Sequence, residues 1–276
     1  WNFIGAAASI LRDQGGNIVI NLFCGPSVNA ARGIAVQVNT AITGFVQNFM
    51  TALNPQITKS YASGNKEYMM TLIFQGARFS FYLLLLLSLP ILINTHYILV
   101  IWLKLVPEHA VIFVQLILIF ALHESLASPL ITAMLATGNI KKYQIIAGGL
   151  NFLNLPTSYI FLRLGASPEI VFIIAIFFSV TVQIARLLLL RDMIQLDLFG
   201  YLKHVYINVI IVTIISVVAP LLFKMFTTGN LISLIISLLF TLIWTSFVIV
   251  LIGCKKEERT FIKNKLILVL TKFIKK

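Results

Sequence analysis

The sequence predicts an integral membrane protein built entirely from α-helices, with about eight transmembrane spans. Apolar residues make up 59% of the 276 residues and charged residues only 11%, and the mean hydropathy is +0.97. A soluble domain has roughly 45–50% apolar and about 25% charged residues, so this composition indicates a membrane protein. Apolar stretches of about 20 residues, the length that a bilayer requires, follow one another along the chain.

Turn-forming residues delimit the predicted spans. Clusters of Gly, Pro, Asn and Ser, which mark turns, separate most of the successive apolar stretches. The spans run over residues 1–24, 27–53, 67–93, 108–136, 141–164, 168–191, 203–226 and 230–253. Because most connections are short, we expect neighbouring spans to be antiparallel.

Two of the connections have features of their own. The helical pattern of the second span continues to about Tyr61, so we expect this helix to kink or end near Asn54-Pro55, or to project from the membrane. The longest connection, Asn94 to Pro107, contains Trp102 and is predicted to form a short amphipathic helix along the membrane interface.

The distribution of Lys and Arg predicts the orientation. One set of connections holds Lys59, Lys66, Lys141, Lys142, Arg191, Lys203 and the basic tail 255–276, whereas the opposite set holds only Lys104, Arg163 and Lys224. The positive-inside rule places the first set, and with it both ends of this chain, in the cytoplasm. The tail alternates basic and apolar residues, which is typical either of an amphipathic helix on the anionic inner leaflet or of a solubilising stop-transfer segment. The net charge of +12 is therefore a topology signal, and we expect no nucleic-acid partner, since no exposed face interleaves basic and aromatic residues.

Strongly polar residues interrupt the first two spans. A charged side chain at the bilayer centre costs about 2.5–3.5 kcal/mol, and such residues persist when they face a bundle interior or a water-filled cavity. We therefore expect a polar, partly cationic cavity. The residues predicted to line it are Arg12, Asp13, Asn17, Asn21, Asn29, Arg32, Gln47, Glu124 and Asn151.

Several of these residues also have a purely structural interpretation. Asn and Gln side chains in membrane helices often do no more than join neighbouring helices by hydrogen bonds. Arg12 and Asp13 form either part of the cavity wall or an interhelical structural pair. Because adjacent residues on a helix point about 100° apart, we do not expect these two to neutralise each other along the helix.

The remaining charged residues leave similar alternatives open. Arg32 lies about 9 Å of helix from Pro26, within snorkelling reach of the outer surface. Glu124 is either a site for a cation or proton or the partner of a buried arginine. Arg78 and Arg186 lie nearer the cytoplasmic ends of their spans and are predicted to be membrane-surface anchors.

The sequence has no pattern typical of catalysis or metal binding. It contains no nucleophile-elbow, zinc-protease or phosphate-loop motif, no Cys/His metal spacing, and no room for a large extramembrane domain. We therefore predict that the protein is not an enzyme and has no cofactor. Cys24 and Cys254 fall near opposite ends of the membrane and are not expected to pair. The chain starts at Trp1 inside a polar span, and we expect it to be the C-terminal portion of a longer protein.

Four segments carry a family resemblance. They are RDQGGNIVINLFCGPSVNAARGIA at 12–35, LNPQITKSYASGN at 53–65, ATGNIKKYQ at 136–144 and GGLNFLNLPTSYIFLRLGASP at 148–168. Together they resemble the polysaccharide-exporter branch, the O-antigen-type flippases, of the multidrug/oligosaccharidyl-lipid/polysaccharide superfamily. The resemblance covers about residues 1–193, and the last two spans match by pattern only.

The resemblance implies a fold of two six-helix lobes around a central cavity. On that plan, residues 1–193 form the second lobe, 194–254 two additional helices and 255–276 a basic cytoplasmic tail, and a first lobe of the same protein is missing. The implied location is the inner membrane of a bacterium.

The resemblance also implies the cargo, an undecaprenyl-pyrophosphate-linked oligosaccharide flipped to the outer leaflet for surface polysaccharide synthesis. Arg12 and Arg32 would contact the pyrophosphate or acidic sugars, and Arg32 lies in the span where the related lipid II flippase also places a cavity arginine. Sugar hydroxyls would meet Asn17, Asn21, Asn29, Gln47 and Asn151. Membrane lipids, a glycan polymerase and glycosyltransferases are the implied partners. Two alternatives remain: a drug/cation antiporter in which Asp13 and Glu124 bind the coupling ion, and a non-transporting scaffold of a glycan-assembly complex.

Overall fold

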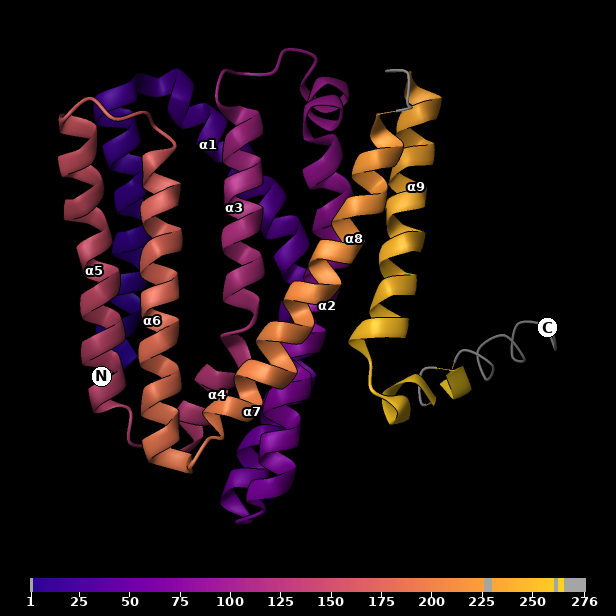
Figure 1. Ribbon diagram of the computed structural model, residues 1–276. Coiled ribbons are helices and arrows are strands. Elements are labelled where there is room, and N and C mark those ends of the chain that lie inside the picture. The colour runs from indigo at the N-terminus through magenta and orange to yellow at the C-terminus, as the bar shows by residue number, and fades with distance from the viewer. Residues whose placement is uncertain (1, 226–229, 261–262, 266–276) are drawn as a thin grey trace.

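The computed structural model describes residues 2–225, 230–260 and 263–265, and within these ranges every regular element is a helix. Figure 1 shows the helices packed side by side as an elongated bundle. They are α1 (Asn2–Ala62), α2 (Lys66–Leu103), α3 (Ala110–Ser125), α4 (Ser128–Ala136), α5 (Lys141–Arg163), α6 (Ile170–Ile194), α7 (Leu198–Tyr201), η1 (Leu202–Ile207), α8 (Asn208–Lys224), α9 (Leu231–Val248) and η2 (Ile249–Gly253), in which η1 and η2 are short π-helices.

Seven helical stretches of the described residues are long and apolar enough to cross a membrane. They are α1, α2, α3 with α4, α5, α6, α7 to α8, and α9 with η2. This confirms the prediction of an all-α, multi-pass membrane protein.

The first of these stretches is broken at Gly25. The backbone there has φ +84° and ψ 174°, a left-handed conformation that glycine adopts at little cost, and Pro26 then starts the second limb. The limbs fold back on each other, because Arg32 Nη2 in the second donates a hydrogen bond to the carbonyl of Asp13 in the first, at 2.6 Å. The boundary predicted between the first two spans is therefore confirmed.

Pro55 does not end the second limb of α1. Gly25 is the residue inside α1 with non-helical dihedral angles, and the helix continues through Pro55 to Ala62. Contacts with the bundle hold this turn, since Ile57 is buried and Asn54 Oδ1 accepts a hydrogen bond from Thr132 Oγ1 at 2.7 Å. Of the predicted alternatives, a kink or an end of the helix at Asn54-Pro55 is wrong, because these contacts offset the backbone bond that proline removes, whereas projection from the membrane stays a prediction.

The connection predicted after residue 93 is largely helical. It forms the last part of α2, which is kinked at Asn94 (φ −110°, ψ 21°) and continues to Leu103. Trp102 is exposed there, and the placement of this segment at the membrane interface stays a prediction.

The helices form two groups joined through α2. The limbs of α1 pack against α5, α2, α3 and α4, and α6 packs against α5 and α3. The α8–α9 hairpin contacts the rest of the chain mainly through α2, as Figure 1 shows.

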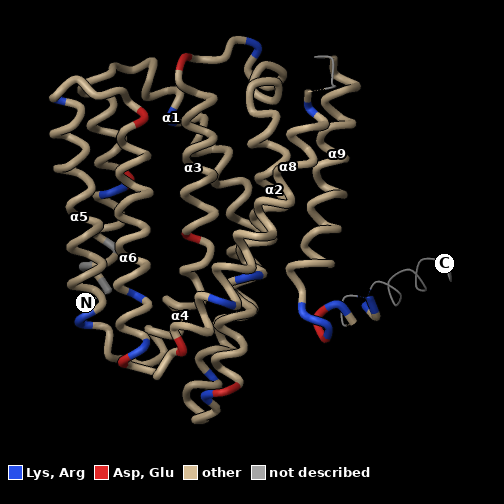
Figure 2. Tube along the Cα trace, in the orientation of Figure 1, with Lys and Arg blue, Asp and Glu red and all other residues tan. Residues whose placement is uncertain are grey.

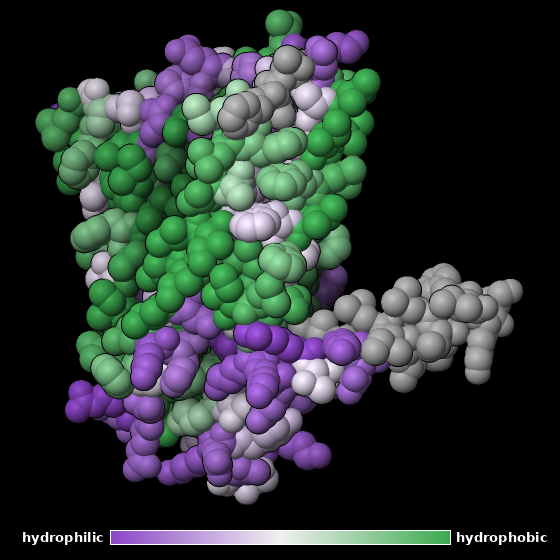
Figure 3. All heavy atoms as spheres, turned by 45° about the vertical axis from the view of Figure 1, so that its right-hand side comes forward, coloured by the Kyte–Doolittle hydropathy of each residue, from purple (hydrophilic) through white to green (hydrophobic). Residues whose placement is uncertain are grey.

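Many of the charged residues lie toward the ends of the bundle, although several lie between them. Figure 2 shows most Lys and Arg residues toward the end where α2 and α5 begin and α6 terminates. Figure 3 shows an apolar band above this hydrophilic end. The tail 255–276 is described only at 255–260 and 263–265, where 256–260 and 263–265 are helical. The rest of the predicted amphipathic helix lies outside the described residues.

Candidate functional site

A small polar pocket lies where the two limbs of α1 meet. Arg12, Asp13 and Gly16 on the first limb and Arg32 on the second contribute to its wall. Gly16 lies close to Val171 and Arg32, since a Cβ atom there would be in van der Waals contact with Val171 Cγ1 at 3.4 Å and with Arg32 Nη2 at 3.6 Å. A larger side chain at this position would push Arg32 away from the first limb.

Arg12 and Asp13 are paired, which corrects the prediction that they do not neutralise each other. Arg12 Nε lies 2.9 Å from Asp13 Oδ1. The Cβ atoms diverge, but the long arginine side chain bends back around the helix and reaches the carboxylate of the next residue. The same guanidinium lies over the ring of Phe120, with its central carbon 5.2 Å from the ring centroid.

Arg32 points into the bundle and does not snorkel to the surface. Its Nη2 atom is bonded to the Asp13 carbonyl, so the limb junction holds the guanidinium beside the Arg12–Asp13 pair. Two cations and one carboxylate give these side chains a net charge of +1.

α5 adds an unsatisfied donor to the pocket. Asn154 is buried, with 2% of its surface exposed, and its Nδ2 atom has no hydrogen-bond partner among the described residues. It lines the same cavity of about 60 Å³, which α3 and α6 close with Ile117, Phe120, Val171, Phe172 and Ala175. This volume is about that of two water molecules. An oxygen-bearing anion would satisfy the Asn154 amide, because an anion supplies the missing acceptor.

Asn154 is not among the predicted cavity residues, whereas Asn151 on the same helix is. Both lie on α5, three residues apart, and the repeated Asn was the available signal. Asn151 is half-buried and does not line the pocket. The pocket therefore unites three of the nine predicted residues, Arg12, Asp13 and Arg32.

The other predicted residues are spread along α1 and α3. Asn17 and Asn29 are half-buried, Asn21 and Gln47 are exposed, and Glu124 lies in a separate cluster. Asn29 Oδ1 is buried without a hydrogen-bond partner in the described structure.

The exposed surface of α1 mixes polar residues with large apolar ones, among them Ile10, Ile18, Leu22 and Phe45. Asp13 is 61% exposed, and the exposed residues of α1 also include Gln14, Asn21, Gln37, Thr40, Gln47 and Asn48. By contrast, the large exposed residues of α9 are apolar, among them Leu231, Ile232, Ile235, Ile236, Leu239, Ile243 and Phe247. Lipid tails suit the surface of α9, whereas polar side chains at membrane depth belong against water or protein.

A second polar cluster joins α3 to α6. Ser179 Oγ donates a hydrogen bond to Glu124 Oε1 and lies 2.7 Å from His123 Nδ1. Farther along α6, buried Arg186 bonds Gln183 Oε1 and, at 3.2 Å, the hydroxyl of Tyr143 on α5. The residues Ser179, Gln183 and Arg186 follow a spacing of four and three, a helical stripe that would have predicted this cluster.

Two predictions about these charges are corrected, and one of two alternatives is excluded. Among the described residues Glu124 forms no ion pair with an arginine and its partner is the Ser179 hydroxyl, so of its two predicted roles the site for a cation or proton is left. Arg186 is buried and is no membrane-surface anchor. Arg78 is also buried, paired with Glu258 at 2.5 Å, because the segment after η2 folds back over it.

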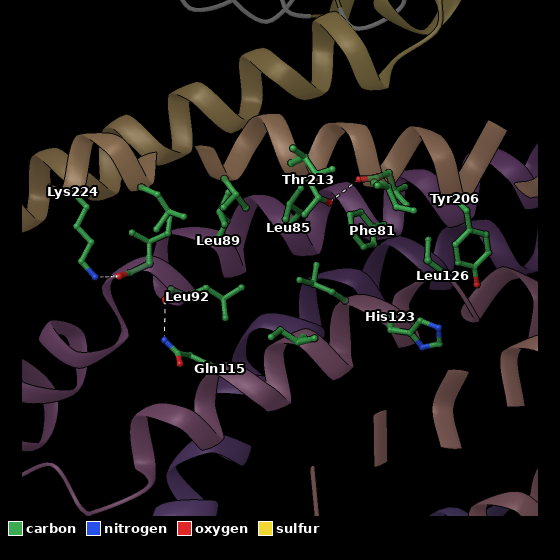
Figure 4. A pocket seen from close by; sticks show the side chains of 18 residues that line it. Phe81, Leu85, Leu89, Leu92, Gln115, His123, Leu126, Tyr206, Thr213 and Lys224 are labelled. Atoms are coloured by element: carbon green, nitrogen blue, oxygen red, sulfur yellow. Dashed lines mark hydrogen bonds between the residues drawn. The ribbon is translucent and has the colours of Figure 1, made fainter. Parts of the chain in front are cut away.

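An apolar groove of about 730 Å³ lies between α2, α3 and α8. Figure 4 shows Lys224 and Gln115 toward one of its ends and His123 and Tyr206 toward the other. The groove and the pocket use different sides of α3, since Phe120 faces the pocket and Ile119 the groove. We therefore treat the groove and the pocket as two separate sites.

Comparisons with known proteins leave the family open. No family description matches the chain, and neither a curated protein nor a solved structure matches it. Among the described residues, no cluster of three or more His, Cys, Asp or Glu side chains could hold a metal ion.

Proposed function

We propose that this chain forms one wall of a transport pathway for an anionic lipid-linked oligosaccharide, as an O-antigen-type flippase of a bacterial inner membrane. The observation that carries the proposal is the polar exposed face of α1, which leads to a pocket of net positive charge. Such a face needs water or an opposing protein wall. We propose that a first lobe supplies the opposing wall. We also propose that the two limbs of α1 are two separate spans, so that the seven stretches, with the first divided at Gly25, give the eight predicted spans.

The chemistry of the pocket favours an anionic headgroup. Arg12, Arg32 and Asn154 present N–H donors, and the carboxylate among the polar side chains that line the pocket, Asp13, is already paired with Arg12. A pyrophosphate that leaves water needs charge-assisted hydrogen bonds, each worth about 1.5–3 kcal/mol. Arginine supplies these in the forked geometry that suits phosphate oxygens.

The pocket is too small to enclose the cargo in this conformation. Its 60 Å³ admits one edge of a phosphate group, so the glycan must lie along the exposed polar residues of α1. Binding of the whole headgroup requires the α1 limbs to move apart from α3 and α6, as expected in a transporter that alternates its access.

The Arg12–Asp13 pair weakens the alternative of an antiporter. A coupling cation at Asp13 would have to displace the guanidinium of Arg12 and would then sit beside Arg32. In a scaffold without transport activity, the polar face of α1 would contact no cargo, and a protein partner would have to cover it.

The test replaces the arginines in the full-length protein, with its first lobe, expressed in a flippase-null strain. We expect Arg12→Ala and Arg32→Ala each to reduce surface glycan at equal membrane abundance, and Asp13→Asn to have a smaller effect. Asn154→Leu should reduce export, and its matched control Asn151→Leu on the same helix should reduce it less. Normal export in the Arg12→Ala/Arg32→Ala double variant would refute the proposal. Loss of activity in Asp13→Asn alone would favour the antiporter.

A further inference from the structure

His123, Ser179 and Glu124 form a hydrogen-bonded chain inside the membrane. Glu124 lies near the middle of the Ala110–Ala136 span, and Ser179 lies in the Ile170–Ile194 span. The Ser179 hydroxyl bridges them, in contact with Glu124 Oε1 and 2.7 Å from His123 Nδ1. This is not the arrangement of a hydrolase triad, because the carboxylate touches the serine and not the imidazole.

The bridging hydroxyl has one proton, which restricts the chain to two arrangements. If Ser179 donates to an ionised Glu124, then His123 must donate its Nδ1 proton to Ser179. If Glu124 carries a proton, it donates to Ser179, and Ser179 donates to an unprotonated Nδ1. The second arrangement leaves the imidazole proton on Nε2.

The two arrangements differ by one proton. A proton that binds to Nε2 of His123 converts the first into the second when the Nδ1 proton passes to Ser179 and the Ser179 proton passes to Glu124. No other bond forms or breaks. His123 lines the apolar groove between α2, α3 and α8, so its side chain connects the groove with the carboxylate.

We propose that His123, Ser179 and Glu124 form a proton-binding site, in which a proton taken up on His123 at the groove is stored on Glu124. This site does not depend on the identity of the cargo, so it can be tested independently of the flippase proposal.

The surrounding groups suit a change of one charge. Arg186 on α6 has no carboxylate partner within 4.0 Å among the described residues, and it bonds the neutral Gln183 and Tyr143. Tyr206 on η1 lines the groove beside His123, and Tyr201 on α7 donates to the Leu126 carbonyl at 3.3 Å. With Glu124 ionised, Arg186 and Glu124 balance, whereas protonation leaves the cluster with a charge of +1.

The experiment follows both ends of the relay while the pH is varied. The chain in lipid nanodiscs carries 13C labels on Glu carboxyl and His imidazole carbons, and the signals of Glu124 and His123 are assigned by their loss in Glu124→Gln and His123→Gln. In the wild type we expect both signals to change with one shared midpoint, because interacting sites titrate as a pair. In Ser179→Ala the hydroxyl that passes the proton is absent, so the two signals should change with separate midpoints.

Two further variants control for packing. Ser179→Thr keeps the hydroxyl and should keep the shared midpoint. Ser158→Ala removes another buried serine hydroxyl, on α5, and should leave both titrations unchanged. Separate midpoints in the wild type, an absence of titration at Glu124, or a shared midpoint that survives Ser179→Ala would each overturn the proposal.

Discussion

Removal of the Glu258 carboxylate should release the segment that follows η2 from the bundle. Arg78 and Glu258 are 2% and 8% exposed and form an ion pair at 2.5 Å. Arg78 Nη1 also donates to the Gly253 carbonyl at 3.0 Å, and Glu258 Oε2 accepts from the backbone N–H of Lys255 at 2.7 Å. This clamp fastens the end of the last span to α2, so Glu258→Ala leaves a buried cation without its partner.

The expected magnitude follows from the burial of the pair. Removal of one partner from a buried ion pair costs about 3–5 kcal/mol. We take about 3 kcal/mol, because Arg78 keeps its bond to Gly253 and the clamp lies at the membrane end. If the segment opens locally, this cost raises the open population roughly 150-fold.

The alkylation rate of Cys254 measures this opening. Its thiol is 2% exposed and lies beside the clamp, and Cys24→Ser removes the other cysteine. Burial raises the pKa of the Cys254 thiol, the Glu258 carboxylate raises it further, and Arg78 opposes them. Glu258→Ala therefore also lowers this pKa and increases the reactive thiolate, so both effects accelerate labelling.

Two variants separate the clamp from a general effect of charge. Glu257→Ala removes the neighbouring exposed carboxylate and should leave the labelling rate within about threefold of the wild type, a change of less than 1 kcal/mol. Arg78→Met/Glu258→Met replaces both charges by apolar groups and should label more slowly than Glu258→Ala. If Glu258→Ala itself stays within about threefold of the wild type, the clamp does not hold the segment and the energetic argument is wrong.

Three further predictions concern topology, pH and packing. Cysteines that replace Lys66, Lys141 or Lys255 should react with membrane-impermeant reagents only from the cytoplasm. Cysteines that replace Lys104 or Ser167 should react only from outside. Labelling of position 141 from outside would show that the predicted topology is wrong. Partial burial raises the pKa of Glu169, but hydrogen bonds from its own backbone N–H, His109 and Ser167 outweigh this and hold it below 4.5. In thermal melts the wild type should be more stable than Glu169→Gln by its full margin above pH 4.5, and this margin should shrink as the pH falls through the lowered pKa. Equal stability of the two proteins at pH 7 would contradict the prediction. Gly76→Leu should lower the unfolding free energy by about 1–3 kcal/mol, because a Cβ there would lie 3.3 Å from the rigid ring of Pro129 as well as 2.4 Å from Leu53 Cδ2, which leaves no room for the rest of the side chain. Gly44→Leu is the control, since a Cβ there has nothing within 4 Å, and equal melting temperatures of the two variants would disprove the packing argument.

The helical architecture could be predicted because its signals are local. Short stretches of consecutive residues are enough to recognise the length of a span, the turn at Gly25-Pro26 and the connections that are rich in Lys and Arg. Pro55 shows the limit of that reasoning, since a proline ends a helix only when nothing else holds the turn. Here the contacts of Asn54 with Thr132 and the burial of Ile57 hold it, and these partners are distant in the sequence.

The partners of charged residues in a membrane bundle are the part that sequence patterns determine least. A helical wheel fixes the direction of a Cβ atom, but an arginine side chain extends well beyond it, which is why Arg12 reaches Asp13 and Arg32 reaches back across the turn. Arg78 was predicted as a surface anchor because its span position lies near the water, yet a carboxylate 180 residues later covers it. Charged and polar residues at membrane depth therefore indicate where a bundle needs hydrogen-bond or ion-pair partners. Only the fold determines whether the partner is a neighbouring residue or a distant segment. For the Asn154 donor, we propose that the partner is a group that the chain itself does not supply.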